Sequence, residues 1–359
     1  MSALSAPTEI IERVDAALAE VLSASAADFA RISPSAAELI EPIRSFTAKG
    51  KRIRALIAWW GFELAGGSAS AEPGIARVAA SVELLHAAAL IHDDIIDDSD
   101  TRRGRPAIHA AYRTGHAEQG WTGDSELYGI GAGIIAGDLC LVLSEQVYTA
   151  SGLARLTTPS VIRHHDDFRR EVMVGQFLDI RLQAAPVAAE EVSERAREVL
   201  TYKSAKYSVE HPLLLGAALG GADDALLGRL AGFGLPLGRA FQLRDDELGV
   251  FGDPEVTGKP AGDDLRQGKK TVLVGSALTR LDAETADWFS SRLGAPDLTD
   301  AEIVRMEELL RSTGALAAFE QEIDSEIARA EAALGRLDIA DADRDRLAEY
   351  IRRLTRRSA

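Results

Sequence analysis

The chain has 359 residues, 46% of them hydrophobic, which is enough for a large buried core and, by length alone, for about two domains. Its 40 Lys and Arg residues against 56 Asp and Glu give a net charge of -16, which argues against nucleic acid as the main partner. Cys140 is the only cysteine, so an internal disulfide is excluded.

The N-terminal residues carry Glu9, Glu12 and Asp15 in a helical pattern, unlike the basic and apolar start of a signal peptide. No stretch reaches the roughly 18 uncharged apolar residues expected of a membrane span. A single cysteine also fits a reducing compartment. These features predict a cytoplasmic protein with no membrane span.

Apolar residues recur at helical spacing along nearly the whole chain, and alternating runs of Val, Ile and Thr are absent. In chain order, helices are predicted near 8–27, 36–65, 75–98, 127–150, 160–183, 189–219, 223–250, 270–291, and in several pieces from 300 to the end. No linker rich in Pro, Gly or Ser divides them. We therefore predict an all-α fold, a single domain over residues 1–359 in which a large helical bundle surrounds a central cavity.

The helix predicted at 75–98 carries an acidic end and an apolar body. At about 100° per residue, Val82, His86 and Ala89 fall on the same face as Asp93. We therefore expect an anion-binding opening at the acidic end of the helix and, below it, an apolar channel, called the shaft here, lined by this face. The substrate that this arrangement suggests has a phosphate head and a hydrocarbon tail.

Two acidic clusters, at 93–100 and 245–247, dominate the chemistry of the sequence. Asp93 and Asp97 are four residues apart, so both carboxylates leave one helix face and repel each other unless a cation lies between them. Mg²⁺ accepts one or two carboxylates and completes its coordination with water and substrate phosphate. A solvated acidic face is the simpler interpretation, but the apolar run 87–91 before Asp93 argues against it, and the alternating ligands and central Gly of a calcium loop are missing.

Five stretches in the order of the chain resemble the trans-isoprenyl diphosphate synthases, also called polyprenyl synthetases. They are Gly50-Lys51-Arg52-Ile53-Arg54; Glu83-Leu84-Leu85-His86 with 93–103; Gly175-Gln176-Phe177-Leu178-Asp179; Tyr202-Lys203-Ser204; and Phe241-Gln242-Leu243-Arg244-Asp245-Asp246 with Thr257-Gly258-Lys259. The resemblance covers roughly residues 40 to 275. One aspartate motif alone is weak evidence, whereas five in order are specific.

The resemblance implies a role for each matched residue. Asp93, Asp97 and Asp245 would hold three Mg²⁺ ions, with Asp94 and Asp246 in supporting positions. The allylic diphosphate would be bound by Arg102, Lys203, Lys259 and Lys269, and isopentenyl diphosphate by Lys51, Arg54, His86 and Arg103. Lys203, Ser204 and Gln242 would stabilise the allylic cation that ionisation leaves. A homodimer is also implied.

The chain departs from the family pattern in two places. Gly249 stands where the second aspartate motif usually ends in Asp, and we expect metal binding to survive because Asp245 is the main ligand there. Lys49 replaces the first Gly of the basic motif, and Ala55 replaces its usual Pro. Neither change removes a predicted ligand.

Chain-elongating synthesis is favoured over two alternatives. A class I terpene cyclase has only one diphosphate substrate, which would leave Lys51, Arg54 and His86 without a role. A non-catalytic partner subunit would be free to lose its acids, yet both clusters keep theirs.

The product length depends on the residues that line the shaft. Ala88 and Ala89 stand where short-chain members of the family carry bulky aromatics, so the floor must lie deeper, near Leu85 or at 139–143. Geranylgeranyl diphosphate, C20, is thus the expected product, with farnesyl or longer polyprenyl diphosphates as the alternatives.

Overall fold

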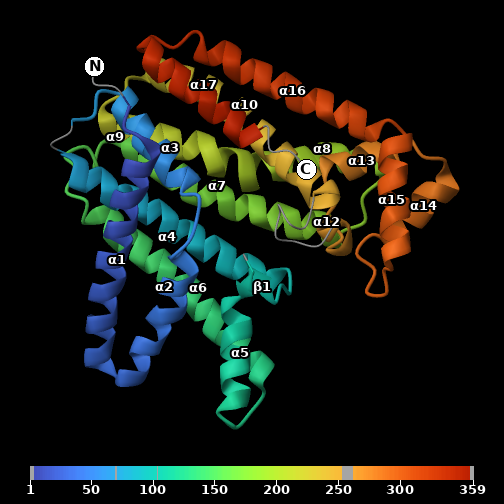
Figure 1. The fold of residues 1–359 in the computed structure, drawn as a ribbon, viewed down its shortest axis with the longest axis horizontal. Helices are drawn as coiled ribbons and strands as arrows, with labels where there is room; N and C mark the ends of the chain where they lie inside the picture. The colour runs from blue at the N-terminus through green and yellow to red at the C-terminus, as the bar shows by residue number, and fades with distance from the viewer. Residues whose placement is uncertain (1–3, 69–70, 103, 253–261, 356–359) are drawn as a thin grey trace. The chain divides into compact units, whose positions relative to one another are not determined.

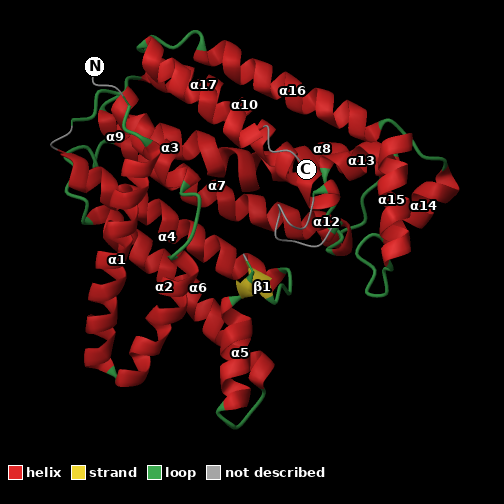
Figure 2. Ribbon diagram, in the orientation of Figure 1, coloured by secondary structure: helices red, strands yellow, loops and turns green. Residues whose placement is uncertain are grey.

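The computed structural model describes residues 4–68, 71–102, 104–252 and 262–355. Helices make up most of this part of the chain, and the rest is almost entirely loops and turns (Figure 2), which confirms the all-α prediction. The described strands are two residues long: β1 (Thr101–Arg102) pairs antiparallel with β2 (Arg105–Pro106), with Thr101 opposite Pro106. This hairpin follows the first acidic cluster and was not predicted.

The chain divides into two compact units, each described by itself. The N-terminal unit comprises Leu4–Ile162 and Leu215–Ala222. The C-terminal unit contains Arg163–Leu214 and Asp223–Ala359.

The N-terminal unit is built around one apolar helix. Its helices are α1 (Pro7–Ile32), η1 (Pro34–Leu39), α2 (Ile40–Thr47), α3 (Ile53–Leu64), α4 (Glu72–Ile96), α5 (Ile108–Glu118) and α6 (Ser125–Thr149). In Figure 1, α4 runs through the unit, where it packs against α6, α3 and α1. Most of its side chains are buried, including Val82 and Leu85, because only an apolar helix can be covered on several faces.

The C-terminal unit is organised around α10 (Asp224–Phe251), which lies along the long helix α16 (Figure 1). Helix α10 also packs against the segment η3. The other helices are α7 (Pro159–Ala184), α8 (Ala189–Val199), η3 (Leu200–Glu210), α9 (His211–Gly220), α12 (Asp263–Arg266), α13 (Val272–Leu278), α14 (Ala283–Arg292), α15 (Asp300–Ser312), α16 (Ala315–Leu334) and α17 (Asp341–Thr355). The first residues of α7 and the last six of α9 are assigned to the N-terminal unit. Asp223 caps α10 by accepting a hydrogen bond from the backbone N–H of Leu226, which satisfies one donor of its first turn.

Two helix predictions were wrong in extent, and one helix was missed. The predicted helix 36–65 is interrupted at 48–52, where Arg52 adopts a left-handed φ of 50°. The helix predicted at 270–291 is two helices, α13 and α14, separated at 279–282. Helix α5 lies in the stretch between the helices predicted at 75–98 and 127–150, where no helix was predicted.

Segment η3 is a π-helix, in which the backbone N–H of His211 reaches back five residues to the C=O of Lys206. Such helices are rare beyond a single turn and are often found at functional sites. Glycines on both sides allow neighbouring helices to approach its backbone. A Cβ on Gly175 of α7 would lie 2.3 Å from the backbone N of Lys203, and one on Gly238 of α10 would lie 2.3 Å from the C=O oxygen of Ala205.

Two helices, α4 and α6, are long and apolar enough to cross a membrane by length and composition alone, although each contains charged residues, such as Glu83 and Asp138. Of the apolar window, 78% is buried in α4 and 39% in α6. Core helices of globular proteins have the same properties, so this is weak evidence for a membrane span.

Candidate active site

The first acidic cluster lies at the C-terminal end of α4. The backbone N–H of Asp97 donates to the C=O of Asp93 at 2.8 Å, so the two residues are one helical turn apart, as predicted. Asp94 between them is fully buried, and Nε of Arg102 donates to its Oδ1 at 2.6 Å. A nitrogen of Arg102 also lies 3.5 Å from Oδ2 of Asp93, so the hairpin β1–β2 places this cation beside the acids.

Burial raises the pKa of Asp94, and the Arg102 guanidinium opposes only part of that rise. The other carboxylate oxygen of Asp94, Oδ2, is buried and has no hydrogen-bond partner. A buried carboxylate oxygen without a partner is costly unless a cation or water reaches it. This end of α4 is therefore suited to a divalent cation.

The basic group predicted to bind a second diphosphate begins in the same unit. Nη1 of Arg54 lies 3.2 Å from Nε2 of His86, so the structure brings these two predicted residues together. Lys51 is exposed at the end of the loop before α3. Arg103 lies outside the described residues.

Arg52, for which the sequence indicated no role, fixes this loop. Its guanidinium is 4% exposed, and it pairs with Asp15 at 2.8 Å and with the buried Glu83 at 3.2 Å. It also donates to the C=O of Thr47. A buried Arg held by two acids stabilises the left-handed backbone that sets Lys51 at the loop end. The sequence does not show this role, because Asp15 and Glu83 are far from Arg52 along the chain.

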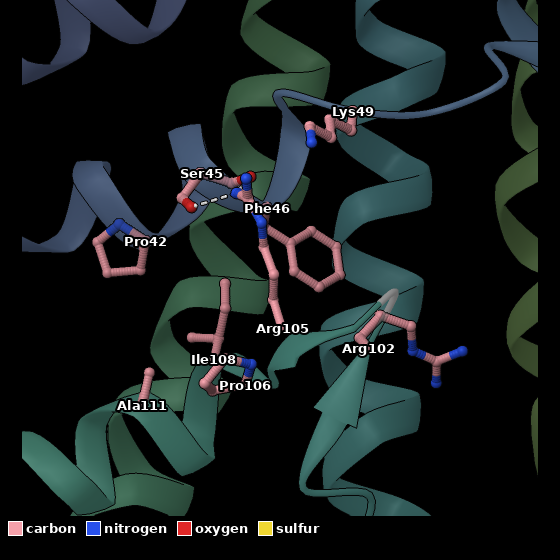
Figure 3. A pocket seen from close by; sticks show the side chains of 9 residues that line it. All are labelled: Pro42, Ser45, Phe46, Lys49, Arg102, Arg105, Pro106, Ile108 and Ala111. Atoms are coloured by element: carbon pink, nitrogen blue, oxygen red, sulfur yellow. Dashed lines mark hydrogen bonds between the residues drawn. The ribbon is translucent and has the colours of Figure 1, made fainter. Parts of the chain in front are cut away.

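A cavity of about 290 Å³ opens beside the hairpin (Figure 3). Its lining includes the cations Lys49, Arg102 and Arg105 and the apolar side chains Phe46 and Ile108. Figure 3 shows Arg105 extended toward Ser45, to whose Oγ it donates at 3.0 Å. The Lys that replaces the usual Gly of the basic motif thus adds a cation to the wall of this cavity.

The second acidic cluster lies near the end of α10. Asp245 is exposed, and Nε2 of Gln242 donates to Oδ1 of Asp246 at 2.7 Å. Burial, and next the Asp264 carboxylate, raise the pKa of Asp246 well above its usual value. Lys269 lies 3.6 Å from Oδ1 of Asp264, which places it among these acids. Lys259 lies outside the described residues.

Gly249, the departure in the second motif, has a structural explanation. A Cβ at this position would lie 2.0 Å from Oδ2 of Asp264 and 2.4 Å from its Cγ. The side chain of Asp264 therefore occupies the space into which an Asp at 249 would project. Asp264 is 7% exposed and belongs to α12. It was missed because the sequence does not show that α12 returns to α10.

Lys203 lies in η3, and its Nζ donates to Oδ2 of Asp179 on α7 at 2.5 Å. The neighbouring Ser204 is half-buried. The approach of α7 to this backbone depends on Gly175, as described above. The Gly-Gln-x-x-Asp and Lys-Ser motifs are therefore in direct contact.

The residues predicted to control chain length lie on α4 below the acids. Leu85 and Ala88 are buried, at 2% and 0% exposure, and Ala89 is half-buried. The two alanines leave little side-chain volume along this part of the helix.

Among the described residues, no three His, Cys, Asp or Glu side chains converge closely enough to hold a metal by themselves. Magnesium sites that are completed by substrate phosphate and water use only one or two carboxylates from the protein. The paired Asp93 and Asp97, and the exposed Asp245, fit that kind of site.

Comparison with known proteins gives one consistent answer. The family model described as polyprenyl synthetase matches residues 36–310. The chain is 32% identical over 290 residues to a geranylgeranyl diphosphate synthase of Mycobacterium tuberculosis, covering 80% of this chain and 75% of the other. It is 33% identical over 276 residues to a (2E,6E)-farnesyl diphosphate synthase of the same species, covering 74% of this chain and 68% of the other.

Among solved structures, the chain resembles the geranylgeranyl pyrophosphate synthase of Corynebacterium glutamicum complexed with isoprenyl diphosphate and magnesium. The TM-score is 0.90 at 38% identity, covering 99% of this chain and 100% of that one. Helix order, and not only local motifs, is therefore shared over the whole length.

Proposed function

Because the chain belongs to the polyprenyl synthetase family and is a trans-prenyltransferase, we propose that it condenses isopentenyl diphosphate with allylic diphosphates to form all-trans geranylgeranyl diphosphate, C20. The observation that carries the proposal is the pairing of Arg54 with His86 at 3.2 Å in the unit that also holds Asp93 and Asp97. A basic pair of side chains in the same unit as a pair of carboxylates suits an enzyme that binds two diphosphates. A cyclase would need only one.

Three carboxylates would hold Mg²⁺ in the proposed site: Asp93, Asp97 and Asp245. When bound, the ions neutralise the charge that develops on the diphosphate leaving group. Asp94 and Asp246 act in support, since Asp94 holds Arg102 and Asp246 accepts from Gln242. We infer three ions per site from the number of these carboxylates and from the family.

The cations divide between the two substrates. Arg102, Lys203 and Lys269 bind the allylic diphosphate, together with Lys259. Lys51, Arg54 and His86 bind isopentenyl diphosphate, together with Arg103. A guanidinium such as that of Arg54 matches two phosphate oxygens at once, which fixes the orientation of the diphosphate as well as its position.

The reaction needs no protein nucleophile. The allylic carbon–oxygen bond breaks, the electron pair leaves with the diphosphate, and the allylic cation is stabilised by the dipoles of Lys203, Ser204 and Gln242. The isopentenyl double bond attacks this cation and forms the new carbon–carbon bond. The released diphosphate then accepts the proton that restores a double bond. Residues 1–359 act in this proposal as one synthase domain.

The C20 product is supported by the small side chains on α4. Ala88 and Ala89 lie about one turn before Asp93, at about 1.5 Å of rise per residue, and in this proposal their small side chains leave room for the growing tail. Leu85, one further turn away, is a candidate for the floor. Since similar proteins make both C15 and C20 products, this length needs a direct test.

A homodimer is supported by one face of α6. Leu127, Ile134, Ile135 and Val142 follow one side of this helix and are 68%, 42%, 53% and 62% exposed. Apolar side chains in such a stripe are typical of a surface covered by another subunit. Light scattering should give the mass of a dimer, and Val142→Glu should lower it toward that of a monomer. We place the enzyme in the cytoplasm, consistent with its diphosphate substrates.

Incubation with isopentenyl diphosphate, each allylic primer and Mg²⁺, followed by chromatography of the dephosphorylated products, tests the proposal. Wild type should yield the C20 alcohol. Ala89→Phe should shift output to C15 or shorter while turnover persists, because an aromatic ring would block the shaft. No elongated alcohol would exclude the synthase activity, and an unchanged length in the variant would mean that the tail does not run along α4.

A further inference from the structure

One face of α7 meets the π-helix η3 at three positions that are four residues apart. They are Glu171, Gly175 and Asp179, which a helix places one above another. Asp179 accepts from the side chain of Lys203, and Gly175 lies against the backbone of Lys203. Glu171 provides a third connection one turn away, and the proposed function gives it no role.

The Glu171 carboxylate joins two residues that follow Lys203. Its Oε2 accepts from Nζ of Lys206 at 2.7 Å and from Nε2 of His211 at 2.9 Å. Lys206 belongs to η3 and His211 begins α9, so one oxygen connects both ends of a wide helical turn to α7. The side chain of His211 is only 5% exposed.

The charge states make these bonds strong. Burial raises the pKa of Glu171, but the hydrogen bonds from Lys206 and His211 outweigh that effect and hold the pKa below its usual value. Burial lowers the pKa of His211, and Glu171 reverses only part of the fall. A carboxylate therefore faces an ammonium group and a neutral imidazole N–H. Phe168 packs against the imidazole at 6.0 Å between ring centroids, which keeps water away.

The backbone of η3 needs such support from its neighbours. A π-helix is less stable than an α-helix of the same sequence, so tertiary contacts have to hold the wide turn open. Gly175 and Gly238 let α7 and α10 approach this backbone closely, but a glycine supplies no side-chain bond. Glu171 supplies a charge-assisted one on the α7 side.

We propose that Glu171 is a positioning residue for Lys203: by joining Lys206 and His211 it holds the π-helical turn in the conformation that presents the Lys203 ammonium group to the diphosphate of the allylic substrate. This inference rests on the proposed role of Lys203. In this proposal Glu171 does not contact the substrate and acts through η3 and the first residue of α9.

A merely stabilising role for Glu171 makes a different prediction. Loss of a stabilising bond lowers the unfolding midpoint but leaves the folded fraction with normal Michaelis constants. Loss of a positioning bond weakens the one substrate that Lys203 binds. The ratio of the Michaelis constants for the allylic and isopentenyl substrates separates the two roles.

The experiment measures both Michaelis constants for Glu171→Ala, Glu171→Gln and Lys203→Ala and for the double variant Glu171→Ala with Lys203→Ala. We expect Glu171→Ala to raise the allylic constant about tenfold, the loss expected for a charge-assisted contact, and the isopentenyl constant less than twofold. Glu171→Gln keeps the shape and one acceptor, so its effect should be smaller. The double variant should be no worse for the allylic substrate than Lys203→Ala alone.

Glu322→Ala is the matched control. It removes a two-point ion pair with Arg197 at 2.8 and 2.9 Å in the same unit. The Glu322 side chain is 31% exposed, against 24% for Glu171, and its hydrogen bonds go to Arg197 of α8 and not to η3, so the variant should leave both constants unchanged. If Lys203→Ala leaves the allylic constant unchanged, the proposed role of Lys203 is wrong and the inference falls with it. If Lys203→Ala raises the allylic constant but Glu171→Ala and Glu171→Gln do not, Glu171 does not position Lys203. The same conclusion follows if the effects of Glu171→Ala and Lys203→Ala on the allylic constant simply add in the double variant. The Gln variant keeps the test decisive if the Ala variant does not fold.

Discussion

Restoring the usual aspartate of the second motif, by Gly249→Asp, should harm this protein. The new Cβ would lie 2.0 Å from Oδ2 of Asp264, a separation that real side chains do not show. The new carboxylate would also join Asp246 and Asp264 on a partly buried surface. A change that makes the motif more typical should thus lower the stability of the fold.

The size of the effect has a steric and an electrostatic part. Overpacking costs about 1–3 kcal/mol, and removing a glycine from within α10 returns about 0.5–1 kcal/mol through helix propensity. Two like charges about 4 Å apart at an effective dielectric constant of about 20 repel by about 4 kcal/mol. Gly249→Asp should therefore lower the free energy of unfolding by roughly 4–6 kcal/mol, and Gly249→Ala, which adds no charge, by much less.

Urea unfolding followed by circular dichroism, at neutral and at mildly acidic pH, measures both parts. The pKa of Asp246 is already raised in the folded protein, so the folded state binds this proton more tightly than the unfolded chain. The contribution of this group to stability therefore grows as the pH falls toward the unfolded value and is lost as the pH rises. The difference in the free energy of unfolding between Gly249→Asp and Gly249→Ala should therefore become smaller at acidic pH.

A double variant, Gly249→Asp with Asp264→Ala, provides the control because it clears the space. It should recover most of the stability lost in Gly249→Asp. If Gly249→Asp alone is as stable as wild type, the contact between Gly249 and Asp264 is refuted. If the difference in free energy of unfolding between Gly249→Asp and Gly249→Ala does not depend on pH, the electrostatic part is refuted.

Three further outcomes are expected. Asp93→Ala should abolish nearly all turnover at saturating Mg²⁺ with an unchanged circular dichroism spectrum, and wild-type activity in this variant would contradict the metal assignment. Arg52→Ala leaves Glu83 buried without its partner and should lower the free energy of unfolding by about 3–5 kcal/mol in urea titrations; a loss below about 1 kcal/mol would mean that the pair is solvated. Burial raises the pKa of Cys140 to about 12, so mass spectrometry should find this thiol unmodified by iodoacetamide at neutral pH until urea unfolds the chain; rapid alkylation of the folded protein would contradict its burial.

Long apolar helices were predictable because their apolar residues recur at helical spacing in the sequence. The prediction of 75–98 and the observed α4 differ by only a few residues at each end. The break before α3 was not predictable, since it depends on the contacts of Arg52 with Asp15 and Glu83. Helix α5 was missed because its 11 residues include Gly115 and several polar side chains, which obscure the apolar repeat.

The residues of the candidate site were likewise predictable where a local motif marks them and unpredictable where a tertiary contact decides. The motifs predicted the pairs Asp93–Asp97 and Arg54–His86, since these act locally or match the family pattern. Asp264 could not be assigned, because the path of the chain after α10 decides that its carboxylate fills the space beside Gly249.

The π-helix η3 also determines how this segment responds to a change in chain length. In an α-helix, deletion of one residue turns every later side chain by about 100°, which usually ruins the packing. In η3 the N–H groups already reach back one residue further, as from His211 to Lys206, so a deletion leaves enough donors and acceptors to close α-helical turns. A one-residue alignment gap within 200–210 would therefore mark a change of helix type between homologues, with the helix itself still continuous.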